Sequence, residues 1–339
     1  GPLSDRLGRK KVLLAGVVFF VITCLLILMT NNIESFLALR FVQGFGLSVI
    51  AAVGYAAIQE TFEERDAIKV MALMANISLL APLLGPVVGA FLIDHVSWHW
   101  GFIGIAILAF LSWFGLKAKM PEVKVNTPKQ PLRYIWDDYK QVFKNKTFLA
   151  LTFGLPMVAM PLMLWIALSP VMLVEELGLS SFEYGLAQFP VLGGLIVGNI
   201  VLIKLIDRLK LGTTVLIGLP LMLLGTLIVG LGLVWREYFL YTVIIGMTLV
   251  SFGEGISFSV LYRFALMSSN VSKGTVAAAV SVLMMFSFFI VIELVRIAYV
   301  HFHLWAYVLS CITLILLWFS FPLYSLKKVM QERQAKGEF

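Results

Sequence analysis

Apolar stretches of about 20 residues recur along almost the whole chain, and a helix of that length crosses a hydrocarbon core of roughly 30 Å. The composition agrees, because 60% of the 339 residues are hydrophobic and only 13% are charged. The mean hydropathy is +0.95. Since the stretches leave no room for a sizeable soluble domain, the chain is predicted to be an all-α integral membrane protein.

Polar breaks divide the apolar stretches into ten predicted membrane spans. They cover residues 12–30, 35–59, 67–93, 100–117, 147–172, 184–206, 213–234, 238–263, 275–299 and 304–324. The two cysteines, Cys24 and Cys311, both fall within apolar runs. We therefore expect them to be packing residues without a disulfide or a metal.

The formal net charge of +7 raises the question of nucleic-acid binding. If the spans alternate in direction, however, all but three of the 26 Lys and Arg residues fall on one side of the membrane. Arg236 lies on the opposite side, and Arg40 and Arg296 lie within spans. By the positive-inside rule, residues 1–11, the loop at 117–147 and the C-terminus are predicted to be cytoplasmic. The basic charge is interpreted as a topology signal, and no nucleic-acid partner is expected.

An internal repeat indicates two related halves. The sequence LSDRL at 3–7 matches LIDRL at 205–209, and an apolar helix with a glycine follows each copy. Two spans precede the second copy in its half and none precedes the first, so we expect a fragment that lacks roughly two N-terminal helices of a parent of twelve. The predicted parts are an N-terminal bundle at 1–117, a linker with an amphipathic surface helix at 118–146, a C-terminal bundle at 147–325 and a cytoplasmic tail at 326–339.

The opening segment, GPLSDRLGRKKVL at 1–13, combines glycines with one acid among several cations. Glycine permits a tight turn between helices. An acid among cations at the membrane surface can form charge-assisted hydrogen bonds that break when the loop moves. Some of the basic residues are explained by their role in fixing the membrane orientation. That role does not explain the spacing of Asp5 and Gly8.

Arg40 lies inside the second predicted span, where a cation costs roughly 2.5–3.5 kcal/mol on insertion scales. Its helical face also carries Gly44, Leu47, Ala51 and Tyr55. Small residues followed by a tyrosine suit the wall of a cavity better than a lipid-facing stripe. The alternative is a structural arginine whose hydrogen bonds are satisfied by neighbouring carbonyls.

The third predicted span contains APLLGPVVG at 81–89, with two prolines and two glycines. Proline removes an intrahelical hydrogen bond, and glycine permits close approach of another helix. We expect this segment to bend and to pack closely in its extracytoplasmic half. Packing alone also explains proline and glycine in many membrane helices.

Charged residues also lie within spans of the second half. Glu254 has no obvious sequence partner and is a candidate to carry a proton. Glu293 and Arg296 are three residues apart and are expected to neutralise each other. The histidines lack an accompanying carboxylate or cysteine cluster, and there is no nucleophile elbow, P-loop or dinucleotide fingerprint. We therefore expect no metal site, no cofactor and no enzymatic activity.

Together these motifs resemble the drug:proton antiporter branch of the major facilitator superfamily, most closely its MdfA-type multidrug transporters. The opening segment fits the superfamily loop signature G-x-L-[A/S]-D-R-x-G-R-K-x-x-L at every fixed position. GPVVG at 85–89 is similar to the antiporter motif, although Ala90 replaces one of its usual paired glycines. The more specific resemblance is carried by residues 54–64, 72–91, 160–170, 180–190 and 272–279.

This resemblance implies the major facilitator fold, with two pseudo-symmetric helical bundles and ten of twelve transmembrane helices present here. It also implies a proton-coupled antiporter of the bacterial inner membrane that confers antibiotic resistance. Such transporters export lipophilic cations and neutral drugs such as chloramphenicol by alternating access. The implied partners are drugs, protons and membrane lipid, and we expect a monomer.

At matching positions the resemblance implies a cytoplasmic gate of Asp5, Arg9 and Glu60, with Arg40 modulating the proton site. The implied pocket wall comprises Leu47, Tyr55, Met74, Ser78, Leu162, Met163, Ile166 and Phe288. Methionine and aromatic side chains suit adaptable binding, because they offer apolar area without fixed hydrogen-bond geometry. The antiporter motif comprises Pro82, Gly85, Pro86 and Gly89. The family's acids on its first helix have no counterpart here, and Glu254 is an expected additional protonation site.

Two other functions stay open at this point. A nutrient or metabolite symporter of the same superfamily should have several polar residues in its cavity, whereas this wall is mostly apolar. A non-transporting membrane scaffold or receptor would not need Arg40, Glu254 and kinked helices inside the membrane.

Overall fold

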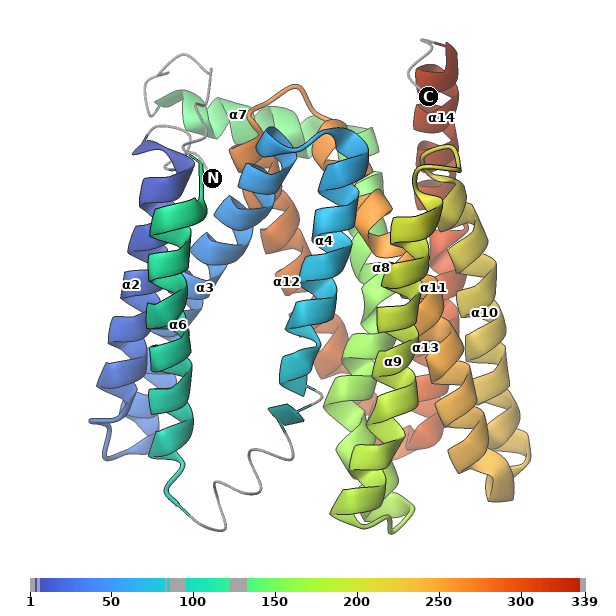
Figure 1. Cartoon of the computed structure of the whole chain (residues 1–339). Coiled ribbons are helices and arrows are strands. Elements are labelled where there is room, and N and C mark those ends of the chain that lie inside the picture. The colour runs from blue at the N-terminus through green and yellow to red at the C-terminus, as the bar shows by residue number, and fades with distance from the viewer. Residues whose placement is uncertain (1–3, 5–6, 83, 86–95, 122–132, 336–339) are drawn as a thin grey trace. The chain divides into compact units, whose positions relative to one another are not determined.

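The computed structural model describes residues 4, 7–82, 84–85, 96–121 and 133–335, and the regular elements of these residues are helices (Figure 1). They are α2 (Arg9–Ile27), α3 (Ile33–Thr61), α4 (Glu64–Ser78), α6 (His99–Lys119), α7 (Arg133–Lys144), α8 (Lys146–Pro170), η1 (Val171–Glu176), α9 (Ser181–Leu205), α10 (Thr213–Val234), η2 (Arg236–Tyr238), α11 (Phe239–Met267), α12 (Lys273–Phe302), α13 (Leu304–Trp318) and α14 (Phe321–Ala335).

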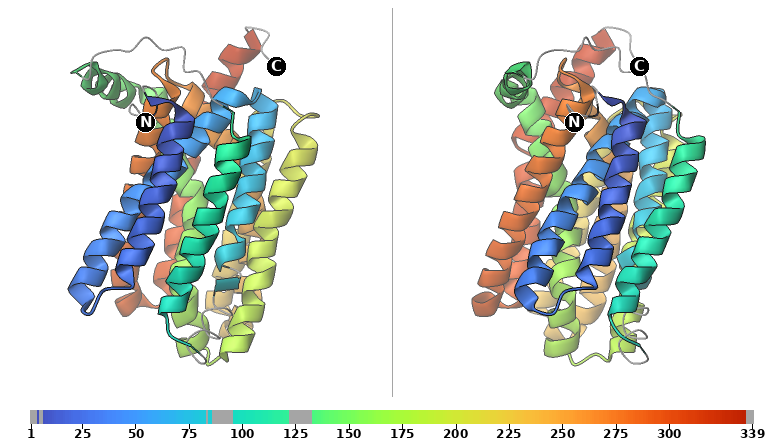
Figure 2. Two further views of the ribbon diagram at one scale, coloured as in Figure 1. Left: turned by 60° about the vertical axis from the view of Figure 1, so that its left-hand side comes forward. Right: turned by 90° about the vertical axis from the view of Figure 1, so that its left-hand side faces the viewer.

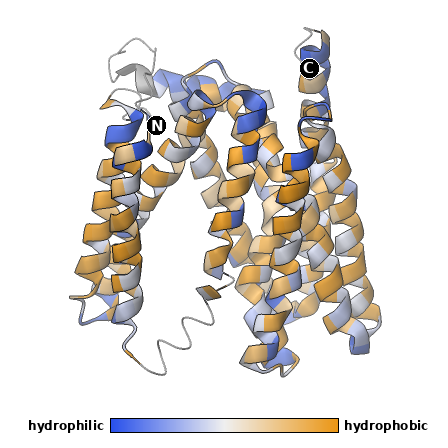
Figure 3. Cartoon of the chain, in the orientation of Figure 1, coloured by the Kyte–Doolittle hydropathy of each residue, from blue (hydrophilic) through white to orange (hydrophobic). Residues whose placement is uncertain are grey.

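Within the described residues, nine helical segments are long and apolar enough to cross a membrane. Each coincides with one of the predicted spans, and Figure 3 shows mostly apolar residues along the middle of these helices. The prediction of an all-α, multi-pass membrane protein is confirmed. The remaining predicted span, 67–93, begins within α4 and continues into residues outside the described part of the chain.

The chain forms two compact units, each described here by itself. Unit 1 comprises Gly1–Glu63, Gly85–Lys144 and Ser269–Ser281. Unit 2 comprises Glu64–Leu84, Asn145–Ser268 and Val282–Phe339. Helix α4 thus precedes the linker in sequence but packs against α9 and α11 of unit 2. The predicted division into two bundles, a linker and a tail stays a prediction.

In unit 1, α2 packs against both α3 and α6 (Figure 2). Val12, Leu13 and Val53 form a buried cluster, which Leu116 of α6 and Met120 at its C-cap extend. Helix α7 runs across the direction of α2 and α6 and matches the helix predicted in the linker (Figure 1). It is amphipathic, because Val142 is fully buried whereas Trp136 is 68% exposed.

Glycines set the helix spacing in unit 2. A methyl group built on Gly194 or Gly198 of α9 would overlap the carbonyl oxygen of Thr248 or Phe252 of α11, so these backbones touch. The internal repeat has a structural counterpart in Gly16 and Gly218. Each follows its copy of the repeat and lies against the next helix of its own unit, α3 and α11 respectively.

Replacing Gly198 by valine is expected to destabilise unit 2 by about 1–3 kcal/mol or more, because the side chain would force α9 and α11 apart. Gly193 of the same helix provides the matched control, since a methyl group there has no atom of the described residues within 4 Å. Thermal unfolding of the two valine variants in detergent measures the difference. Equal stability of Gly198→Val and Gly193→Val would contradict the proposed close packing.

The helix of the third span is interrupted within the described residues, and the bend predicted at 81–89 stays a prediction. Helix α4 ends at Ser78, Leu79 forms a turn, and helical structure resumes at Leu80. Pro82 has no N–H group to donate to the Ser78 carbonyl, which accounts for the break. Gly85 is helical and has no described atom within 4 Å of an added methyl group, so the expected close packing is not seen there. Pro86 and Gly89 lie outside the described residues.

Candidate functional site

Arg9 and Glu60, two of the predicted gate residues, form an ion pair in unit 1. Arg9 is the first residue of α2, and Glu60 lies in the last turn of α3. Arg9 Nε donates to Glu60 Oε2 at 2.9 Å and Nη2 donates to Oε1 at 2.6 Å, which is a bidentate geometry. Arg9 also donates to Ser4 Oγ. Arg9 is fully buried, so the pair fixes the adjoining ends of α2 and α3.

The turn before Arg9 explains why the opening segment needs glycine. Gly8 is the N-cap of α2 and has a φ of 93°, a conformation that side-chain-bearing residues rarely adopt. This conformation lets the chain enter α2 with Arg9 directed at Glu60. Asp5, the third predicted gate residue, lies outside the described residues.

Arg40 of α3 contacts side chains of α3 and α6, and Gln43 links it to α2. It donates to Gln43 of α3, and its guanidinium carbon lies 5.7 Å from the ring centroid of Phe102 of α6. Gln43 in turn donates to Cys24 Sγ of α2 at 2.9 Å. Gln43 and the polar contact of Cys24 were not predicted, although the i, i+3 spacing of Arg40 and Gln43 is a signal for such a pair.

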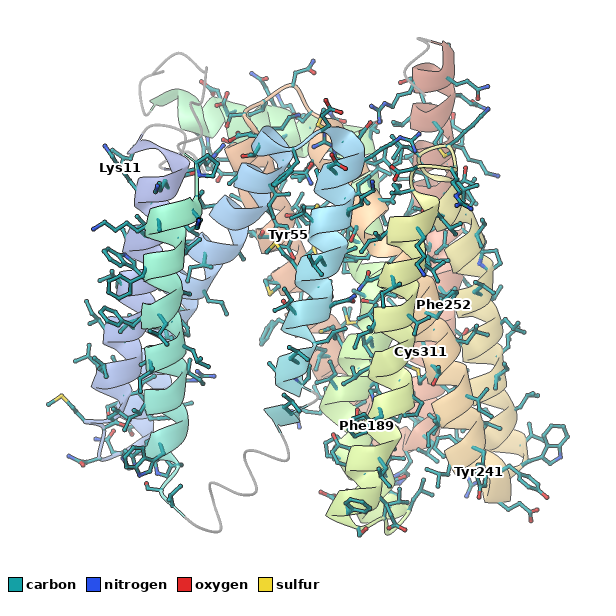
Figure 4. All side chains as sticks on the ribbon, viewed as in Figure 1. Lys11, Tyr55, Phe189, Tyr241, Phe252 and Cys311 are labelled. Carbon is teal, nitrogen blue, oxygen red and sulfur yellow. The ribbon has the colours of Figure 1, made fainter. Side chains whose placement is uncertain are left out.

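The residues of the implied pocket wall divide between the two units. On α3 of unit 1, Leu47 is 58% exposed and Tyr55, labelled in Figure 4, is half-buried. In unit 2, Met74, Met163 and Phe288 are half-buried, and Ser78 and Ile166 are exposed. Leu162 differs, because it is only 1% exposed and therefore belongs to the interior of unit 2. A shared role in one pocket stays a prediction.

Glu254 is a buried acid in the middle of α11. Its neighbours Gly253 and Gly255 contact the backbones of α10 and α9, at Gly218 and Gly198 respectively, so the chain around it is tightly packed. The side chain is 5% exposed, and its Oε2 atom has no hydrogen-bond partner among the described residues. Burying an acid without a hydrogen-bond partner costs free energy, and acids placed in this way within membrane spans are usually functional. Glu254 is therefore a candidate proton-binding group.

Charged contacts that the sequence alone did not reveal hold the first turns of α4 within unit 2. Glu64 accepts hydrogen bonds from Arg333 Nη1 and Nη2 at 2.8 and 2.9 Å and from Arg263 Nε at 3.4 Å. Lys69 Nζ lies 2.6 Å from Asp207 Oδ2. Asp207 is the acid of the second repeat copy, in the place that Asp5 occupies in the first.

Polar side chains also join helices deeper in unit 2. Asn199 Nδ2 of α9 donates to Asn76 Oδ1 of α4 at 2.7 Å. Trp165 Nε1 of α8 donates to Gln188 Oε1 of α9 at 2.8 Å. Amide side chains within apolar runs are rare and need hydrogen-bond partners in a membrane. The sequence could therefore have identified these residues, but it could not have shown which of them are partners.

The local charge pair on α12 was predicted correctly. Arg296 Nε donates to Glu293 Oε2 at 2.9 Å, and Nη2 donates to Oε1 at 2.6 Å. Both side chains are exposed, which limits the contribution of the pair to stability. Because Glu293 is paired with Arg296, Glu254 is the better candidate for an acid that binds and releases a proton in the second half of the chain.

The apolar helical spans define a multi-pass membrane protein. A family model described as Major Facilitator Superfamily matches residues 1–293, and the chain belongs to this family. The chloramphenicol resistance protein CraA of Acinetobacter baumannii is 71% identical over 336 residues, which cover 99% of this chain and 81% of that protein. The multidrug transporter MdfA of Yersinia pestis is 45% identical over 300 residues, which cover 88% of this chain and 73% of that protein.

Solved structures support the fold. The proton:xylose symporter XylE matches with a TM-score of 0.73 at 15% identity, covering 96% of this chain and 84% of that chain. The transporter FucP in an outward conformation matches with a TM-score of 0.72 at 11% identity, covering 94% of this chain and 83% of that chain. At such identities the likeness concerns the fold alone.

Proposed function

We propose that the protein is a proton-coupled multidrug efflux antiporter that exports lipophilic cationic and neutral drugs, including chloramphenicol. The observation that carries the proposal is the 71% identity with a chloramphenicol resistance protein over 99% of the chain. The mostly apolar set of wall residues also favours this function over a symporter of polar nutrients. The buried Glu254 and the bonded Arg40 favour it over a scaffold.

The proposal includes the membrane in which the protein lies and its orientation in that membrane. The protein lies in the bacterial inner membrane as a monomer, with residues 1–11, the loop at 117–147 and the C-terminus in the cytoplasm. The distribution of Lys and Arg supports this orientation, because the cations gather at the ends of the spans that would face the cytoplasm. Drugs then enter the transporter from the cytoplasm or the inner leaflet.

Coupling follows from competition between drug and proton. A drug that enters the apolar cavity displaces a proton from a buried acid. Glu254 is the candidate for this acid in unit 2. After the drug has left, reprotonation of the acid from outside favours return of the transporter to its starting conformation. One proton that crosses the membrane supplies about 2.3 kcal/mol per 100 mV, in addition to the pH gradient. Arg40 of unit 1, linked to Gln43 and Cys24, modulates proton binding.

Two sets of charged contacts would form the cytoplasmic gate. The first is the Arg9–Glu60 pair, and the second is the attachment of α4 through Glu64 and Lys69. Charge-assisted hydrogen bonds of this kind are stronger than neutral ones, so they can stabilise a closed state.

Reversing one charge of the Lys69–Asp207 pair should slow drug transport by up to about fivefold, because partly exposed pairs contribute at most about 1 kcal/mol. The double reversal, Lys69→Asp with Asp207→Lys, should restore most of the rate. Initial rates of drug uptake in inverted vesicles compare the single and double variants. An additive loss in the double variant would show that the two residues do not act as a pair.

Arg40→Ala should lower drug transport by about tenfold, because it removes a charged hydrogen bond at membrane depth. Arg236→Ala is the matched control, since Arg236 is exposed like Arg40 but lies in a short connection on the opposite side. Drug resistance is measured at equal protein levels in the membrane. Unchanged resistance in Arg40→Ala would assign Arg40 a structural role only.

The proposed function is tested by drug susceptibility of a bacterium that lacks its own efflux pumps. Expression of the protein should raise the inhibitory concentrations of chloramphenicol and of a lipophilic cation, and Glu254→Gln at equal expression should not. A symporter would leave the inhibitory concentrations of both drugs unchanged while increasing uptake of a nutrient. A scaffold or receptor would change neither drug susceptibility nor nutrient uptake.

A further inference from the structure

Two buried polar side chains of α11, Ser251 and Glu254, have atoms without a hydrogen-bond partner among the described residues. Ser251 is fully buried and its Oγ atom is unbonded, and Glu254 is 5% exposed and its Oε2 atom is unbonded. Side chains three residues apart on a helix are neighbours, with Cβ atoms about 5–6 Å apart. The hydroxyl and the carboxyl group therefore lie close enough to bond directly or through one shared water molecule.

The free hydroxyl distinguishes Ser251 from other hydroxyl residues of the same helix. Thr248 Oγ1 donates to the Ile244 carbonyl at 2.7 Å, and Ser257 Oγ donates to the Gly253 carbonyl at 2.7 Å. Such bonds to the preceding turn are the usual arrangement for hydroxyls inside a helix. Ser251 forms no such bond, so its hydroxyl is available to donate to another group.

The face of α11 that carries these two side chains lies inside unit 2. Gly253 contacts the backbone of α10 and Gly255 that of α9, so Glu254 lies on a third side of the helix. Met247 lies on the same face, seven residues before Glu254. Its Sδ atom accepts a hydrogen bond from Tyr307 Oη of α13 at 2.9 Å. This face is thus directed into the bundle, where an ionised carboxylate needs a donor.

Few titratable groups face Glu254. Tyr307 and Cys311, which is labelled in Figure 4, share the face of α13 that contacts α11, and Tyr307 already donates to Met247. The charged and titratable side chains of α8, α9 and α4 lie within two turns of a helix end, α10 has none, and η2 precedes the first turn of α11. Within the described part of the chain, no ion pair or hydrogen bond joins any of them to Glu254.

We propose that Ser251 is a positioning residue of the proton site, whose hydroxyl donates to the ionised carboxylate of Glu254. A donated hydrogen bond favours the ionised form of an acid, so it makes release of the proton attainable in an apolar interior. The proton leaves from Glu254, and Ser251 keeps its own. The inference rests on the proposed role of Glu254 and adds the group that supports its ionised state.

Infrared difference spectroscopy of the purified protein tests the inference without any drug, because a protonated carboxyl group has a carbonyl band that the ionised form lacks. The band that disappears in Glu254→Gln belongs to Glu254, and its intensity is followed against pH. Ser251→Ala should move the midpoint upward by about one pH unit, a tenfold change in proton affinity, because the ionised form loses its donor. Ser251→Cys, with a weak donor of similar size, should shift the midpoint in the same direction, and Ser251→Thr should restore it.

Ser257→Ala is the matched control, because it removes a buried hydroxyl of the same helix that is already bonded to a backbone carbonyl. Its midpoint should equal that of the unmodified protein. An unchanged midpoint in Ser251→Ala would overturn the inference, as would an equal shift in Ser257→Ala or the absence of a titrating band of Glu254. Drug-induced proton release is measured separately. If the predicted shift occurs but no drug releases protons, the proposed function fails and the role of Ser251 stands.

Discussion

Replacing Glu60 by alanine is expected to lower the free energy of unfolding by about 3–5 kcal/mol, the cost of removing one partner from a buried ion pair. The variant removes both hydrogen bonds that the carboxylate accepts from Arg9, whose guanidinium is fully buried. The loss is large because the guanidinium of Arg9 stays buried without its carboxylate partner, whose own side chain is 17% exposed. Thermal or denaturant unfolding of the purified protein measures the change.

Glu293→Ala provides the control for this experiment. It also removes a carboxylate that accepts two hydrogen bonds from an arginine, but the Glu293–Arg296 pair is exposed and local to one helix. Stability should therefore change little. Equal losses in Glu60→Ala and Glu293→Ala would show that Arg9–Glu60 is not a buried structural pair. Glu60→Gln, which keeps one acceptor for Arg9, should fall between the two.

Glu254→Gln is expected to reduce proton-coupled drug transport by tenfold or more, the largest functional effect that we predict. Glutamine has nearly the same shape as glutamic acid, so the packing of α11 between Gly198 of α9 and Gly218 of α10 should persist. It cannot bind and release a proton, so a site that depends on this exchange loses its coupling. Drug-induced proton release from purified protein, followed with a pH-sensitive dye, measures the coupling directly.

Glu293→Gln is the matched control for Glu254→Gln, because it neutralises an acid in a neighbouring span that already has a partner in Arg296. Its proton release and transport should match those of the unmodified protein. If Glu254→Gln releases protons and transports drug at the normal rate, Glu254 is a structural acid. The coupling acid must then be sought elsewhere in the protein.

The sequence predicted the helices well because membrane spans depend on a local property, the length of an apolar run. The linker helix, now α7, and the Glu293–Arg296 pair were also predictable, since both follow from helical spacing. Arg9 and Glu60 are 51 residues apart, and the family resemblance was needed to bring them together. The φ of Gly8 then gave a physical reason for the glycine in that motif.

The contacts of α4 could not be predicted in the same way. Glu64 and Arg333 are 269 residues apart, and many other cations lie on the same predicted side of the membrane. Only the packing of α4 in unit 2 decides which acid meets which base. Leu162 shows a related difficulty, because position in an apolar helix does not reveal whether a leucine faces a cavity or the interior.

Drug accumulation in inverted membrane vesicles tests the central claim of proton-coupled efflux most directly. Vesicles that contain the protein are energised to acidify their interior, and uptake of chloramphenicol and of a lipophilic cation is followed with and without an uncoupler. The account predicts accumulation that collapses when the uncoupler is added and that Glu254→Gln greatly reduces. Full accumulation in the presence of the uncoupler would contradict it.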